Sequence, residues 1–199
     1  MFLIRGLVFT HEAVRDWEAK LAPLLAEGLR KRRAGKAGRC WHVDETYVKV
    51  AGEWCYLYRA IDRDGTLVDV YLSETRDMAK AFLRSAKSVT QVEPEQVTTD
   101  VHTSYPKAIA EELGTDVDHR TSQYKNNVME QDHRGVKGRY RSMRGFKNFD
   151  AAHRFCRAFD EVRNFLRSAS YINQNVSLAC RRTLHVQRVA ALRDLLSAA

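Results

Sequence analysis

Three strand-like runs joined by short turns constrain the fold of this chain more than any other feature of its sequence. The runs cover residues 42–50, 54–61 and 66–72, and they are rich in β-branched and aromatic side chains. The two connections have three and four residues, and the second contains Asp64 and Gly65, a pair typical of tight turns. We therefore expect these runs to form a three-stranded antiparallel meander.

The rest of the chain alternates helical segments with short strand-like ones. Apolar residues recur at helical spacing from Asp77 onward, and Pro94 ends that pattern before the next strand-like run. Short strands are expected over residues 96–99 and 116–120, and helices over about 77–86, 104–113, 150–167 and 184–196, with mostly helical structure from residue 127 onward. This order predicts an α/β fold of the ribonuclease-H-like type: a mixed sheet, with three antiparallel strands then short parallel strands, flanked by helices.

The N-terminal residues predict a helix followed by a basic connection. Thr10 suits the N-cap of a helix over residues 11–29. The short apolar stretch before it, with Gly6, resembles the second half of a helix-turn-helix, which makes this region a short helical DNA-binding remnant. Basic residues placed among small ones after this helix predict a flexible linker up to residue 39.

The charges of the chain are distributed unevenly, with basic ends around an acidic middle. Residues 1–39 carry 9 basic and 4 acidic side chains, residues 40–129 carry 10 and 15, and residues 130–199 carry 14 and 6. Basic ends suit a polyanion such as DNA, whose phosphates release counterions when they are neutralised. An acidic middle is consistent with carboxylates that lie together and bind cations. Solvated charge without a partner remains the alternative interpretation.

Composition indicates a cytoplasmic protein with no membrane partner. No apolar run approaches the ~18 residues that a membrane-spanning helix needs. The apolar start is interrupted by Arg5 and Gly6, too early for a signal peptide. The four cysteines lie far apart without metal-ligand spacing, so we expect free thiols and no structural zinc.

Three acidic residues occur where this layout can gather them. Asp44 lies within the first predicted strand, Asp100 directly follows the fourth, and Glu130 begins a helical stretch. Hard divalent cations prefer oxygen ligands, and two such ions can act together on a phosphodiester. Strand alternation points Glu45 away from the face of Asp44, so we expect only Asp44 of this pair in the site. For each acid taken alone, a solvent-facing position is the common alternative.

The sequence blocks around these acids resemble a known family. The resemblance is carried by WHVDETYVKVAGEWCYLYRAIDRDG, VTTDVHTSYPKAI and NNVMEQDHRGVKGRYRSMRGFKNFDAAHRF. These segments are similar to DDE transposases of the insertion-sequence-six family over roughly residues 38–167. The resemblance implies that Asp44, Asp100 and Glu130 are the catalytic, metal-binding triad. It also implies a basic residue seven positions after the glutamate, here Lys137, which a helix would present on the face of Glu130 near a bound phosphate.

The same resemblance implies a cofactor and partners. A transposase of this family uses two Mg²⁺ ions, with Mn²⁺ as an alternative, to cleave at insertion-sequence ends and transfer the strand into target DNA. Its partners would be terminal inverted repeats and target DNA, and a homodimer or larger assembly would hold two ends in a synaptic complex. Such a protein would work on the nucleoid in the bacterial cytoplasm.

Eight basic residues are expected to bind DNA. Two aromatic residues that are interspersed with them in the sequence are expected to stack on bases. The aromatic residues are Tyr140 and Phe146, which alternate with basic side chains as in grooves for nucleic-acid strands. The basic residues are Arg32, Arg33, Arg134, Lys137, Arg139, Arg141, Arg144 and Lys147.

With this family in mind, we divide the chain into three parts. Residues 1–39 form the partial helix-turn-helix and basic linker, residues 40–167 the ribonuclease-H-like catalytic domain, and residues 168–199 a C-terminal helical tail. Two other functions stay open. The short N-terminal module favours a truncated, catalytically impaired DNA-binding remnant that regulates transposition, and the fold alone would also suit another ribonuclease-H-like nuclease, such as one for RNA–DNA hybrids.

Overall fold

One mixed sheet forms the centre of the molecule. A computed structural model describes residues 9–122, 127–143, 145–167 and 176–198. Its strands lie in the order β3-β2-β1-β4-β5. β2 is antiparallel to both β1 and β3, whereas β4 runs parallel to both β1 and β5. Their bounds are β1 Cys40–Val50, β2 Glu53–Asp62, β3 Leu67–Ser73, β4 Gln96–Thr99 and β5 Asp118–Thr121. The predicted meander followed by short parallel strands is confirmed.

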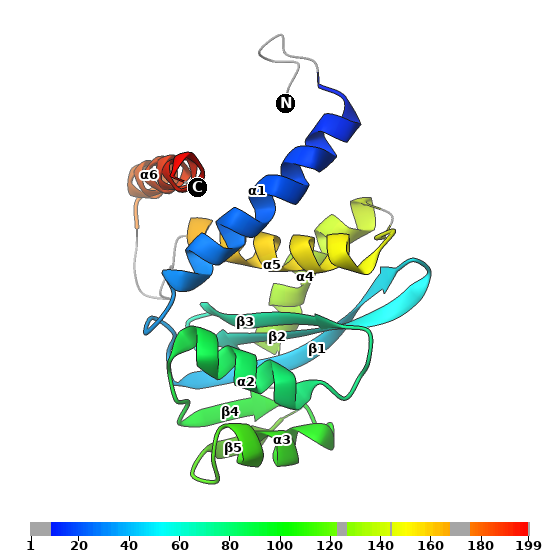
Figure 1. The fold of residues 1–199 in the computed structure, drawn as a ribbon. Helices are drawn as coiled ribbons and strands as arrows, with labels where there is room; N and C mark the ends of the chain where they lie inside the picture. The colour runs from blue at the N-terminus through cyan, green and yellow to red at the C-terminus, as the bar shows by residue number, and fades with distance from the viewer. Residues whose placement is uncertain (1–8, 123–126, 144, 168–175, 199) are drawn as a thin grey trace.

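Helices cover both faces of this sheet. Figure 1 shows α2 and α3 on one side of the strands and α4 and α5 on the other, with α1 lying across α5. The bounds are α1 His11–Lys31, α2 Ala79–Thr90, α3 Ser104–Glu112, α4 Asn127–Ser142, α5 Phe149–Leu166 and α6 Leu178–Ser197. Within the part of the chain that the structure describes, no helix has the length and apolar character needed to cross a membrane.

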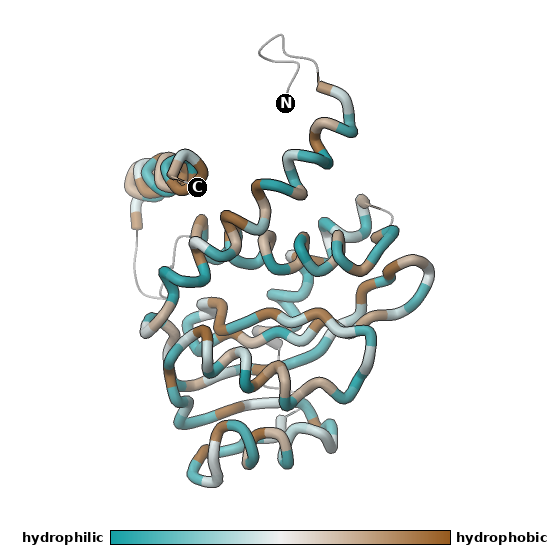
Figure 2. The backbone as a smooth tube through the Cα atoms, viewed as in Figure 1, coloured by the Kyte–Doolittle hydropathy of each residue, from teal (hydrophilic) through white to brown (hydrophobic). Residues whose placement is uncertain are grey.

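Side-chain alternation along β1 sends successive residues into two separate cores. Val43 packs with Phe82 of α2 and Tyr105 of α3. Val48, on the opposite face of the strand, packs with Val136 of α4. Apolar residues therefore recur along the central strands and along the helices that cover them (Figure 2). A strand that is buried on both faces is held firmly in place, which fixes the position of the acidic residues that it carries.

The segment predicted to be a flexible linker is instead fixed to the fold. Arg33 is buried, and its guanidinium donates to Glu161 of α5 at 2.6 and 2.7 Å and to two carbonyl groups of β3 at 2.8 Å. Arg30 donates to Asp69 of β3 at 2.7 Å. A buried guanidinium must be paired, so these contacts hold the end of α1 and the residues after it against α5 and β3. The prediction of a flexible linker was wrong for this reason.

The N-cap of the first helix is confirmed, since the Thr10 hydroxyl accepts from the Ala13 N–H at 3.2 Å. Gly6 and the apolar stretch around it lie outside the described residues. The division of the chain at residues 39 and 167 stays a prediction.

Candidate metal centre

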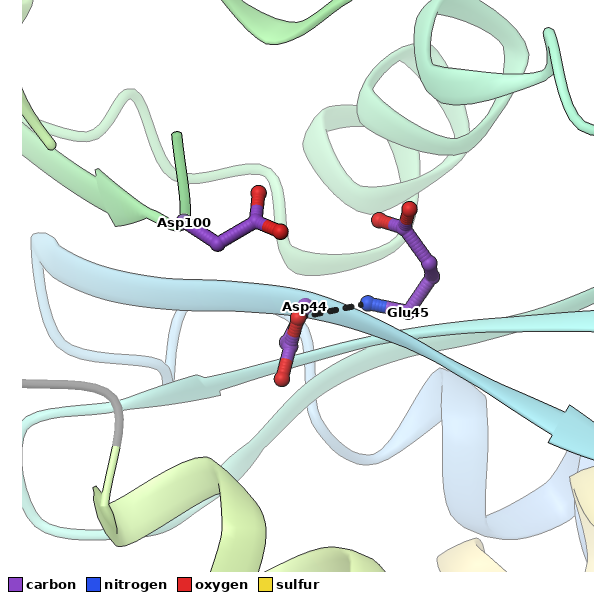
Figure 3. Close-up of side chains that lie close together, drawn as sticks. All are labelled: Asp44, Glu45 and Asp100. Atoms are coloured by element: carbon purple, nitrogen blue, oxygen red, sulfur yellow. Dashed lines mark hydrogen bonds between the residues drawn. The ribbon is translucent and has the colours of Figure 1, made fainter. Parts of the chain in front are cut away.

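Two of the three predicted acids meet where β1 and β4 run side by side. The parallel register aligns His42 with Thr98, so Asp44 and Asp100 stand two residues further along their neighbouring chains. One oxygen from each of Asp44, Asp100 and Glu45 lies within 4.8 Å of the others (Figure 3). Sequentially distant carboxylates are therefore gathered at the carboxyl end of β4, the edge of a parallel pair where ligands commonly bind.

Glu45 belongs to this acidic cluster, and the prediction that it would stay out was wrong. Its side chain does leave the strand on the side opposite Asp44, as alternation requires (Figure 3). It is nevertheless long enough to bring its carboxylate back toward the other two acids. The Tyr105 hydroxyl of α3 donates to Glu45 at 2.5 Å, and the Arg76 guanidinium lies 3.9 Å from it. Burial raises the pKa of Tyr105, so its hydroxyl remains a hydrogen-bond donor.

The carboxylates of the acidic cluster repel one another, and this repulsion acts on the half-buried Asp44. Burial first, and then repulsion from Asp100 and Glu45, raises the pKa of Asp44 to about 7. The Glu45 N–H donates to Asp44 at 3.0 Å and offsets this effect only in part. Clustered carboxylates of this kind fit a hard divalent cation, which binds oxygen ligands and relieves the repulsion among them.

Glu130 lies near the acidic cluster but is not one of its three members. It is exposed on α4, the helix that packs against β1, and its charge is close enough to add to the raised pKa of Asp44. On the next turn of α4, His133 Nδ1 lies 3.9 Å from the Asp44 carboxylate. Burial, followed by the nearby Arg59 and Lys137 cations, lowers the pKa of His133 to about 3, so this imidazole is neutral. The structure thus brings Asp44 and Asp100 together and places Glu130 on the helix facing them.

A buried ionic network that sequence reasoning missed holds α4 in this position. Arg59 of β2 is the direct partner of Asp44 in the strand pairing and is only 1% exposed. Its guanidinium donates to Asp132 of α4 at 2.5 Å and to Asp160 of α5 at 2.8 and 2.9 Å. Arg163 also pairs with Asp132, at 2.7 Å. The signal in the sequence was an arginine inside an apolar strand, because such a residue is tolerated only when it is paired.

The predicted DNA-binding residues occupy different environments. Lys137 is half-buried on α4, and Arg144 lies outside the described residues. Arg33 is committed to Glu161 and to β3, which argues against the predicted DNA contact for this residue. The remaining five are exposed: Arg32, Arg134, Arg139, Arg141 and Lys147.

The two aromatic residues predicted to stack on bases serve the fold instead. Phe146 is buried in the core beneath α4, and Tyr140 stacks on it with ring centroids 6.0 Å apart. The Tyr140 hydroxyl also accepts from the Lys49 N–H of β1 at 2.7 Å. The prediction that these two rings face DNA was wrong. Both side chains instead pack at the end of α4 and hold it against the β1–β2 hairpin.

Comparison with known proteins agrees with this arrangement. A family model described as a DDE domain, of the IS240 transposase type, matches residues 38–169. The transposase for the insertion-sequence-like element IS431mec of Staphylococcus aureus is 39% identical over 153 residues, which cover 72% of this chain and 67% of that protein. The transposase for insertion sequence element IS257 in transposon Tn4003, from the same species, matches to the same extent.

The fold also matches a solved structure. A chain in the intasome of simian T-cell lymphotropic virus, solved in complex with a PP2A regulatory subunit, superposes with a TM-score of 0.52 at 17% identity. The match covers 77% of this chain and 56% of that one, and it confirms the ribonuclease-H-like, integrase-type fold alone. The family model and the sequence relatives together show that this chain belongs to the DDE transposases of the IS240, IS431 and IS257 type.

Proposed function

We propose that this transposase cleaves DNA at insertion-sequence ends and transfers the strand into target DNA, with Asp44, Asp100 and Glu130 as its catalytic, metal-binding acids. The observation that carries the proposal is the meeting of the Asp44 and Asp100 carboxylates beside two parallel strands, where burial and mutual repulsion raise the pKa of Asp44. Glu130 lies on the helix that packs beside them.

Two Mg²⁺ ions, or Mn²⁺ in their place, are the cofactors that fit these acids. When bound, such ions activate the attacking oxygen and stabilise the leaving one during displacement at phosphorus. Asp44 and Asp100 would hold the ions from the sheet, and Glu130 from α4. Neutral His133, buried beside Asp44, adds no positive charge that would repel them.

The basic side chains of α4 supply contacts for the DNA backbone. Arg134 and Lys137 lie one and two turns beyond Glu130 on the same helix, where a phosphate next to the metal ions would pass. Arg139 and Arg141 extend this positive surface along α4. Since two ends must be held together for joining, we propose that the protein acts on inverted repeats and target DNA as a homodimer or larger assembly.

A joining assay tests the proposed function directly. The full chain would be incubated with duplexes carrying the element's own ends, a supercoiled target and Mg²⁺ or Mn²⁺. We expect free 3′-hydroxyls at the ends and joined products, both dependent on the metal. A folded protein that binds these ends but neither cleaves nor joins them with either metal would instead be a regulatory remnant. Cleavage confined to RNA–DNA hybrids would identify a different nuclease.

The affinity for Mg²⁺ is expected to fall as the pH drops below about 7, because a proton and the metal compete for the Asp44 carboxylate. If one proton is displaced per ion, the apparent affinity falls about tenfold for each pH unit below the pKa. Isothermal titration with Mg²⁺ between pH 5.5 and 8.5 measures this slope, with Asp44→Asn as the control. A slope of zero in the unmodified protein would contradict the expectation.

The same carboxyl links pH to stability. Its pKa is raised above the unfolded value, so its contribution to folding is present at low pH and is lost as the pH rises through about 7 in the absence of metal. Added Mg²⁺ should therefore raise the melting temperature more at pH 8 than at pH 5.5. Equal shifts at the two pH values would show that Asp44 is not part of the metal centre.

A further inference from the structure

The end of the β1–β2 hairpin carries exposed aromatic residues that the proposed chemistry does not use. We call Tyr47, Trp54 and Tyr56, together with Lys49, the aromatic shelf. The hairpin that carries them reaches past α2 and α3 (Figure 1). Trp54 is 58% exposed and Tyr47 is 42% exposed, whereas Tyr56 is half-buried. Large exposed rings concentrated on one rigid element commonly mark a binding surface.

The members of the aromatic shelf contact one another in two cross-strand pairs. Tyr47 lies opposite Tyr56 in the strand register, and their ring centroids are 5.4 Å apart. Lys49 lies opposite Trp54, with its ammonium group 5.7 Å from the ring centroid. The rings are thus held at fixed positions beside a cation, because the strand pairing that carries them is regular up to the turn.

The aromatic shelf lies on the same strand face as Glu45 of the acidic cluster. Residues two apart on a strand share a face, so the face runs from Glu45 through Tyr47 to Lys49. At ~3.3 Å per residue, Tyr47 is about 7 Å and Lys49 about 13 Å along the strand from Glu45. Arg76 lies 3.9 Å from Glu45, which places a second cation beside the acidic cluster. The aromatic shelf therefore follows the acidic cluster along one face of the strand.

We propose that the aromatic shelf binds unpaired bases of the DNA strand that flanks the phosphate held at the metal centre. This inference rests on the proposed function, which brings a DNA strand to the acidic cluster. Aromatic faces stack on any base, and neighbouring cations neutralise the backbone, so the combination suits a single strand without sequence preference. At ~3.4 Å per stacked nucleotide, the shelf would hold bases about two to four nucleotides from that phosphate.

The exposed Trp54 can be tested against an exposed apolar residue outside the segments expected to bind DNA. Leu178 on α6 is 72% exposed and serves as the control position. The affinity of each variant would be measured by fluorescence anisotropy with two labelled duplexes of an insertion-sequence end, one fully paired and one with four unpaired flanking nucleotides. Measurement without divalent metal keeps the binding separate from cleavage. Thermal unfolding of each variant confirms that it is folded.

We expect Trp54→Ala to weaken binding of the unpaired-flank duplex about 5- to 150-fold, because stacking contributes ~1–3 kcal/mol per base. Binding of the fully paired duplex should change less than about twofold. Trp54→Phe should retain most of the affinity, and Leu178→Ala should bind both duplexes as the unmodified protein does.

Three results would overturn the proposal. One is an equal loss on both duplexes, and another is an equal effect of Trp54→Ala and Leu178→Ala. The last is a shift from dimer to monomer in sedimentation of Trp54→Ala with DNA affinity unchanged. The last result would make the shelf a contact between two copies of the chain. Absence of joining by the unmodified protein would defeat the proposed function, yet binding to the shelf would remain measurable.

Discussion

Replacing Asp100 with asparagine is expected to lower the rate of strand joining by about 10³-fold or more. The proposed metal ions would lose one of the two carboxylates that meet between β1 and β4, and metal assistance at phosphorus is worth several kcal/mol of transition-state stabilisation. Time courses of joining with Mg²⁺ in excess measure the change. Joining by Asp100→Asn at the rate of the unmodified protein would show that the metal centre is placed wrongly.

The fold should tolerate this substitution. Asp100 accepts the His102 N–H at 3.1 Å, a bond that an asparagine oxygen can also accept. Its charge repels Asp44, so Asp100→Asn should lower the pKa of Asp44 and leave the melting temperature equal or higher. Asp116→Asn is the matched control, because Asp116 is exposed and is not a member of the acidic cluster. It should join strands normally.

The same assay separates the roles of Glu130 and Glu45. Glu130→Gln should reduce joining as severely as Asp100→Asn if Glu130 completes the triad. Glu45→Gln should cost less, because one of its oxygens already accepts the Tyr105 hydroxyl. The reverse order of severity would assign the third metal ligand to Glu45, the acid that lies within the cluster.

Side-chain alternation and turn residues were enough to predict the meander, because its three strand runs are long and are joined by clear turns. The Asp–Gly turn marks the boundary between β2 and β3 within the meander, and the break at Pro94 precedes the parallel strand β4. The pairing of β1 with β4, which brings Asp44 to Asp100, is a long-range contact that no local pattern specifies. It followed from the family resemblance, and the register then confirmed that the two acids are neighbours.

The errors have a common physical cause: the position of each side chain was judged from the local sequence alone. Arg33 was expected to bind DNA from a flexible linker because basic residues alternate there with small ones, yet Glu161 provides the paired charge that allows it to be buried. Tyr140 and Phe146 were expected to face DNA because they alternate with basic residues, but they close a core instead. Glu45 was excluded on backbone direction, although its side chain is long enough to bend back toward Asp44. Each outcome depends on tertiary partners that lie far away in the sequence.

Replacing Arg59 with methionine is expected to lower the free energy of unfolding by about 3–5 kcal/mol at neutral pH. The substitution leaves Asp132 and Asp160 buried without their shared guanidinium. Burial by itself raises the pKa of a carboxyl, and the guanidiniums of Arg59 and Arg163 more than offset that effect for Asp132, whose pKa is lowered. A carboxyl with a lowered pKa stabilises the fold at neutral pH and loses that contribution as the pH falls. The destabilisation by Arg59→Met should therefore be smaller at pH 4 than at pH 7 in urea unfolding experiments.

The two carboxylates of this network allow its structural and functional effects to be told apart. Asp160→Asn and Asp132→Asn each remove one buried partner of Arg59, so both should destabilise the protein by amounts of similar size. Only Asp132 lies on α4, two residues after Glu130, so only its variant should shift the helix that carries a proposed metal ligand. We expect Asp132→Asn to lower the joining rate about tenfold or more and to require more Mg²⁺ for half-maximal joining, at a temperature where both variants are fully folded. Equal joining rates for the two variants would show that the network stabilises the fold without positioning Glu130.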